Sequence, residues 1–167
     1  MIKKVLTTLA AAAIAVAAQA QLAAGEKSLG PKIGYVSHNS SCVAGLVFQY
    51  NLSSRVRLAP ELSCVFRNKS QDALLIDLNV HMPFGVGSDR AWLYPLAGLA
   101  FNSWSTHGVV TADDDDVTTH VNRFGLNAGA GFELRCSETL KINIEAKYTL
   151  VKSYSAAYVT AGISYVF

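Results

Sequence analysis

The sequence predicts an all-β protein, namely an eight-stranded antiparallel up-and-down transmembrane β-barrel. Three observations lead to this fold class. Apolar residues alternate with small or polar residues through most of the chain, and a period of two is typical of β-strands. Only 16% of the residues are charged, against about 25% in ordinary soluble proteins. The last segment, 157–167, alternates up to an aromatic residue, Phe167, whose ring we expect to be covered by something outside the chain.

Residues 1–20 have the pattern of a secretory signal peptide. Two lysines precede an apolar run over residues 5–18, and Ala18-Gln19-Ala20 has the A-x-A form of a cleavage site. The run is shorter than the roughly 20 residues that a spanning helix needs. We therefore expect cleavage near Ala20 and a single barrel domain over residues 21–167.

Charge and cysteine content argue against several classes of function. The chain has 14 basic and 12 acidic residues, and loss of the two signal-peptide lysines would make it formally neutral. A nucleic-acid-binding face needs an excess of basic residues, so no nucleic-acid partner is expected. Cys42, Cys64 and Cys136 do not show the spacing of a zinc site. We expect no metal, no cofactor and no catalytic residues.

Eight strands can be placed by their alternation. Four are clear, over residues 55–67, 73–82, 123–134 and 139–150. Four are less sharp, at about 29–38, 42–51, 91–102 and 156–167, and the segment 91–102 is apolar on both faces. An even number of strands puts both chain ends at one end of a barrel. Turns are expected at that end at 52–54, 83–90 and 135–138, and loops at the other end at 38–41, 67–72, 103–121 and 151–155.

The direction of each face needs further evidence, because a soluble lipocalin-like barrel has an apolar interior and a membrane barrel has an apolar exterior. Glycines lie on the polar face, where a crowded interior requires small residues: Gly125, Gly129, Gly131 and Gly162. Aromatic residues on the apolar face gather near strand ends, as in the girdles of membrane barrels. One group is Phe66, Phe124 and Tyr148, and the other is Tyr50, Phe132, Tyr165 and Phe167. Both observations place the polar face inside.

Charges on the polar face balance, which indicates ion pairs in the interior. An unpaired buried charge costs several kcal/mol. The predicted lumen network is Arg57, Glu61, Asp77, Arg123, Glu133, Lys141, Glu145 and Lys147. A three-residue turn at 136–138 would place Glu133 directly opposite Lys141. The alternative is a set of unrelated surface charges.

The signal peptide, the eight alternating segments and the terminal Tyr165-Val166-Phe167 resemble small outer-membrane β-barrel families. These are the OmpA transmembrane domain, OmpX and the porin-family barrels of Bacteroidetes, which the segments 30–35, 94–99 and 124–132 resemble. The resemblance implies a Gram-negative outer-membrane location, lipid as the surroundings, and a non-enzymatic structural or surface-interaction role with a plugged polar lumen. It also implies a C-terminal signal, Ile163, Tyr165 and Phe167, that the outer-membrane assembly machinery reads. We expect a monomer.

Two other functions remain open. In lipid A deacylases a His and a Ser lie two apart on one strand, and His38 and Ser40 have this spacing. In that family the motif lies late in the chain and faces lipid, so here a polar loop is preferred over a lipid A-modifying enzyme. A soluble periplasmic lipocalin-like carrier is the other alternative.

Three smaller features need an interpretation. A three-residue loop at 52–54 would set Cys42 opposite Cys64, so both a disulfide and two free thiols stay open. Asp77 and His81, four apart on one face, are interpreted as members of the lumen network. The carboxylates at 113–116 predict a solvated loop rather than a cation site.

Overall fold

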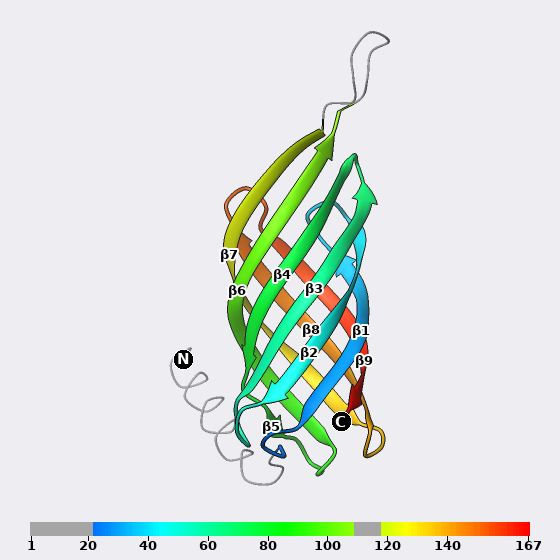
Figure 1. Ribbon diagram of the computed structural model, residues 1–167, viewed down its shortest axis with the longest axis vertical. Helices are drawn as coiled ribbons and strands as arrows, with labels where there is room; N and C mark the ends of the chain where they lie inside the picture. The colour runs from blue at the N-terminus through cyan, green and yellow to red at the C-terminus, as the bar shows by residue number, and fades with distance from the viewer. Residues whose placement is uncertain (1–21, 109–117) are drawn as a thin grey trace, which may run out of the picture.

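Eight long antiparallel strands close into a barrel in the computed structural model, which describes residues 22–108 and 118–167 (Figure 1). The predicted fold class is confirmed. The long strands are β1 (Lys27–Val36), β2 (Ser41–Asn51), β3 (Arg57–Asn68), β4 (Gln71–His81), β6 (Ala91–His107), β7 (Thr118–Arg135), β8 (Leu140–Val151) and β9 (Ala156–Val166). A two-residue strand, β5 (Phe84–Gly85), pairs with β6. Within the described ranges, no helix is long and apolar enough to cross a membrane.

Each long strand pairs with its neighbours along the chain, β4 pairs with β6, and β1 pairs with β9 to close the ring. The closing ladder runs from Ser28 opposite Val166 to Val36 opposite Tyr158. The C-terminus lies at the same end of the barrel as β5 and the β2–β3 turn (Figure 1). We call this the terminal end, and the opposite end the hairpin end.

β6 and β7 are longer than predicted, and they form a hairpin that rises beyond the turns joining β1 to β2 and β8 to β9 (Figure 1). Their ladder continues from Asn102 opposite Arg123 to His107 opposite Thr118. Polar residues dominate this stretch, so the apolar alternation stops before the ladder does, although the threonines among them favour strands. The acidic run 113–116 and the expected signal peptide 1–20 lie outside the described residues.

The exterior of the barrel is apolar and its interior is polar. Along β4, Leu74, Ile76 and Leu78 face outward and are 42%, 48% and 45% exposed, whereas Asp77 between them is buried. This polarity is the reverse of that in a soluble lipocalin-like barrel. On β6, whose faces the sequence leaves open, Trp92, Tyr94 and Leu96 are buried inside, and Leu93 and Leu99 face outward.

Gly131 shows why small residues are needed on the inner face. It lies opposite Tyr94 across the β6–β7 ladder, and a Cβ atom there would overlap the Tyr94 ring. The missing side chain thus provides the space in which the tyrosine ring crosses the lumen.

Two predicted registers are wrong because the turns are longer than predicted. The β2–β3 connection covers residues 52–56, so Cys64 lies opposite Ala44, and Cys42 and Cys64 are free thiols. The first β7–β8 pair is Arg135 opposite Lys141, so residues 136–140 connect the paired segments, and Glu133 lies opposite Asn143 rather than Lys141. A change in turn length shifts every pair in the ladder that follows it.

Candidate functional site in the barrel lumen

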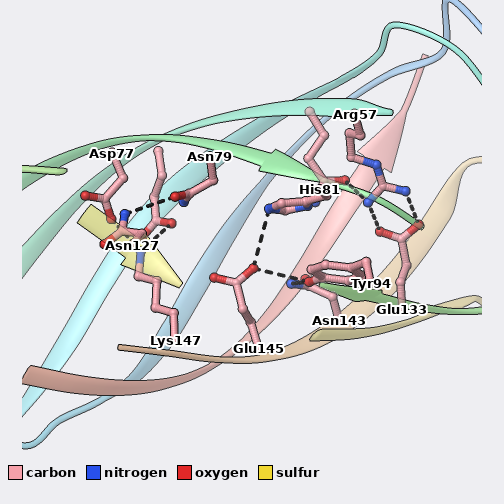
Figure 2. A network of polar contacts seen from close by, with 12 residues as sticks. Arg57, Asp77, Asn79, His81, Tyr94, Asn127, Glu133, Asn143, Glu145 and Lys147 are labelled. Atoms are coloured by element: carbon pink, nitrogen blue, oxygen red, sulfur yellow. Dashed lines mark hydrogen bonds and ion pairs between the residues drawn. The ribbon is translucent and has the colours of Figure 1, made fainter. Parts of the chain in front are cut away.

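The half of the lumen near the terminal end is crossed by an ion pair between β3 and β7 (Figure 2). The Arg57 guanidinium donates two hydrogen bonds to the Glu133 carboxylate, with N···O distances of 2.6 and 2.9 Å. Both side chains are at most 1% exposed. Arg57 also donates to Gln49 and Asn51, at 3.2 and 3.1 Å. A bidentate pair with further hydrogen bonds is the geometry in which buried charges are best satisfied.

A second set of charges lies around Lys147 on β8. The Lys147 ammonium donates to Glu61 at 3.0 Å and to Asp77 at 2.5 Å. Glu61 also binds Lys32 of β1 at 2.6 Å, and Lys32 reaches Glu145 at 3.5 Å. Four strands, β1, β3, β4 and β8, are therefore linked through two lysines.

Tyr94 and His81 lie between the two charged sets (Figure 2). Their rings stack with centroids 4.5 Å apart at an interplanar angle of 15°. The Tyr94 hydroxyl donates to Glu145 at 3.2 Å and accepts from Asn143 at 3.4 Å. His81 Nε2 lies 3.9 Å from a Glu145 carboxylate oxygen. Aromatic and amide groups thus fill the space between the ion pairs.

The interior network has equal numbers of each charge. Its cations are Lys32, Arg57, Lys141 and Lys147, and its anions are Glu61, Asp77, Glu133 and Glu145. Lys141 joins it diagonally, at 3.4 Å from Glu133, despite the shifted register. The formal charge of this set is therefore zero with His81 neutral.

Seven of the eight predicted residues come together in the lumen, and Arg123 does not. Arg123 is exposed, and its side chain donates to the Asn122 carbonyl at 3.1 Å. The β7–β8 ladder begins only at Gly125, so β7 at Arg123 has risen past the rim and its inner face opens to solvent. Lys32 supplies the fourth cation instead. Lys32 lies four residues after Ser28 in β1, so both side chains point to the same, inner face of the strand. This alternation would have predicted an inward Lys32 from the sequence.

An apolar layer fills the lumen nearer the hairpin end. It consists of Val36, Val43, Val65, Ala73, Leu75, Trp104, Ala156 and Tyr158, all buried. Tyr154 packs against this layer, and its ring stacks on Trp104 with centroids 5.5 Å apart. Trp104 is fully buried although it belongs to the part of β6 that the sequence assigns to a loop.

His38 belongs to this aromatic cluster. Its ring lies 4.8 Å from that of Trp104 and 5.2 Å from that of Tyr154. Partial burial lowers the pKa of His38 below its usual range. Ser40 lies in the β1–β2 turn with a φ of 57°. The segment with His38 and Ser40 is therefore a polar loop, as preferred from the sequence. Its His38 ring also packs the β1–β2 turn against the β8–β9 turn at the mouth of the barrel.

The three residues of the expected assembly signal face away from the lumen. Ile163, Tyr165 and Phe167 are 44%, 57% and 62% exposed. The Tyr165 and Phe167 rings stack with centroids 6.5 Å apart. The Phe167 amide donates to the Lys27 carbonyl at 2.9 Å, which ties the last residue to the first strand.

One edge of the long hairpin is free. Residues 118–124 of β7 pair with β6, but among the described strands none pairs with their other edge. An unpaired edge presents a row of backbone donors and acceptors. This segment is therefore the part of the hairpin end that another strand could extend.

Several solved structures of bacterial barrels are similar in fold to this chain. The N-terminal β-barrel domain of OprF from Pseudomonas aeruginosa is 16% identical, with a TM-score of 0.69 over 86% of this chain and 98% of that one. NspA, a neisserial surface protein, is 14% identical, with a TM-score of 0.67 over 85% and 97%. Ail, the attachment invasion locus protein of Yersinia pestis, is 14% identical, with a TM-score of 0.62 over 87% and 100%. At these identities the likeness shows the fold alone.

No curated protein matches the sequence. A family model matches almost all of it, from residue 6 to residue 167, and describes an outer membrane protein beta-barrel domain. Together with the closed barrel and its apolar exterior, this match assigns the protein to the outer membrane. The chain belongs to the outer membrane protein beta-barrel domain family.

Proposed function

We propose that this protein is a non-enzymatic outer-membrane barrel with a closed lumen, and that it acts through its surface at the hairpin end. The observation that supports this most directly is the filling of the lumen. Paired charges occupy the half near the terminal end, and the apolar layer around Trp104 occupies the other half. An interior of this kind serves stability and shape rather than transport.

The closed lumen has a consequence for conductance. An eight-stranded barrel is only wide enough for side chains to fill it, and here Arg57 and Glu133 bridge the lumen directly. Passage of an ion would require that pair to separate, and leaving one member of a buried pair alone costs about 3–5 kcal/mol. We therefore propose that the protein forms no stable channel.

Planar-bilayer recording tests this proposal. Purified, folded wild-type protein is expected to give no steady conductance. The variant Arg57→Ala/Glu133→Ala is also expected to stay closed, because the apolar layer remains in place. Large, steady single-channel currents from the wild-type protein would contradict the proposal.

The free edge of β7 supports the surface role. An extended segment of another protein can add to such an edge through backbone hydrogen bonds. Ail is named for attachment and invasion, and one of its structures holds the heparin analogue sucrose octasulfate. By analogy we propose a contact role for this hairpin, with the terminal end in the periplasm, the barrel a monomer in lipid, and no nucleic-acid partner.

Labelling of intact cells tests the orientation. A membrane-impermeant maleimide is expected to label Thr119→Cys without lysis in a background that lacks the three exposed native thiols (Cys42→Ser, Cys64→Ser and Cys136→Ser). The matched control keeps only Cys136, in the β7–β8 turn at the opposite end, and should be labelled only after permeabilisation. The reverse pattern would place the hairpin in the periplasm.

A further inference from the structure

A groove of about 640 Å³ crosses the outer wall of the barrel where β1 meets β9. A row of residues paired across neighbouring strands forms the centre of the groove. Isoleucine and alanine alternate along this row after its first residue. The row runs Phe132, Ile144, Ala161, Ile33 and Ala44, from β7 to β2. Ile144 and Ile33 form two walls, and Ala161 lies between them as the floor. The volume is that of a small-molecule pocket, about 300–1,000 Å³.

The wall beneath the groove is thin and lacks part of its ladder. Gly162 and Gly45 line it, so no side chain thickens the wall there. The β1–β9 pairing stops after Leu29 opposite Tyr165 and resumes at Lys32 opposite Gly162. Pro31, which has no N–H to donate, lies in this gap and also lines the groove. The groove is therefore a built depression at the closing seam.

The polar side chains at the groove are turned away from it. The Lys32 ammonium is bound to Glu61 at 2.6 Å inside the barrel, and its side chain is 3% exposed. The Asn143 amide donates to the Tyr94 hydroxyl in the lumen. No charge is thus offered to a headgroup by these two residues, and the surface that an occupant meets is hydrocarbon.

We propose that this groove holds one acyl chain of a phospholipid from the leaflet at the terminal end. The groove is continuous with the apolar band that faces the membrane. Phe132 and Leu134 extend the groove toward the C-terminal end of β7. The choice of leaflet rests on the periplasmic orientation proposed above. Lipid tails are as apolar as leucine, so retention comes from packing, because an unfilled groove would leave its walls without contacts.

Native mass spectrometry tests this proposal on the full chain. The protein is reconstituted in vesicles of palmitoyl-oleoyl phosphatidylethanolamine, re-extracted in dodecyl maltoside and measured. We expect a wild-type species that carries the mass of one phospholipid, and loss of that mass in Ala161→Phe, whose ring fills the groove. Ala157→Phe, on the same face of β9 but outside the groove, should keep the lipid.

Each contrary result has a clear meaning. A wild-type barrel without retained lipid, or an Ala161→Phe variant that retains it, would overturn the proposal. A wild-type dimer that Ala161→Phe dissociates would assign the groove to a second copy and overturn it as well. A heat-dependent gel shift confirms that each variant is folded. The bilayer recording of conductance is independent of the lipid measurement. Absence of bound lipid would therefore leave the closed lumen unaffected, and a measured conductance would leave the lipid groove unaffected.

Discussion

Lys147 shows how strongly single residues are held in the lumen. Its ammonium joins two carboxylates, Glu61 and Asp77, with side chains at most 4% exposed. Lys147→Met would leave both carboxylates short of their partner, and breaking a buried pair in this way costs about 3–5 kcal/mol. We expect a loss of this size in the free energy of unfolding, measured by urea titration in detergent with the unboiled gel band as the readout.

Lys152→Met is the control for that prediction. Lys152 is an exposed lysine in the β8–β9 turn, and surface substitutions usually change stability by less than about 0.5 kcal/mol. If the two variants unfold at the same urea concentration, the paired charges do not stabilise the barrel as the geometry indicates.

His38 gives stability a dependence on pH. Burial lowers the pKa of His38 in the folded protein below the ordinary histidine value of 6.5, so between the two pKa values the unfolded chain binds more protons. The contribution of His38 is therefore complete above pH 6.5 and is lost as the pH falls toward the folded pKa. We expect a smaller decline for His38→Phe over this range in urea titrations. Parallel curves for the two proteins would show that His38 does not titrate against folding.

The inner residues that sequence reasoning found and missed differ in a simple way. Glu61, Glu133 and Lys147 were found because each lies in a strand whose other face is plainly apolar. Tyr94 was missed because β6 is apolar on both faces, so alternation carries no information about which side is inside. Arg123 was wrongly assigned to the lumen. Alternation predicts which face of a strand a residue occupies, but not whether the strand at that residue still lies within the closed barrel.

At the scale of elements, alternation predicts strands well and registers poorly. Six of the eight predicted strands begin and end close to their observed bounds, and β6 and β7 exceed theirs at the hairpin. Register depends on turn length, and residues 52–56 and 136–140 separate the first paired residues, where three-residue turns are predicted. Neither segment continues the apolar alternation, so the sequence shows that a turn exists without showing where pairing resumes.

The barrel is expected to fold without the residues that connect the last described pair of β6 and β7. The last described pair of the ladder is His107 opposite Thr118, beyond Trp104, the last β6 residue of the apolar layer. Replacing residues 108–117 with Asn-Gly, which suits a two-residue hairpin and keeps His107 and its contacts with Asp72 and Ser70, should change the free energy of unfolding by less than about 0.5 kcal/mol. The gel shift on boiling should persist. Loss of the folded band would show that the hairpin supports the barrel.

At the scale of the whole molecule, assembly is expected to depend on the last residue. Phe167 is 62% exposed and hydrogen-bonds through its amide to β1, so Phe167→Ala removes an outward ring while the backbone contact remains. We expect less folded protein in the outer-membrane fraction of expressing cells. Phe66→Ala, which removes a ring that is 55% exposed near the hairpin end, is the control. Equal yields for the two variants would contradict a signal at the C-terminus.

The pairing of Arg57 with Glu133 also limits how this barrel can change over time. These residues are 76 positions apart, on hairpins that a recombination event could exchange separately. Every hairpin contributes charged side chains to the lumen whose ion-pair partners lie on another hairpin. The hairpins therefore cannot be exchanged independently of one another. A chimaera whose β3–β4 hairpin lacks Arg57, Glu61 and Asp77 would keep the backbone ladder and lose electroneutrality inside, because Lys32, Lys141 and Lys147 would face only Glu133 and Glu145. Lineages of this barrel are therefore expected to diverge by coordinated changes at distant positions rather than by hairpin exchange.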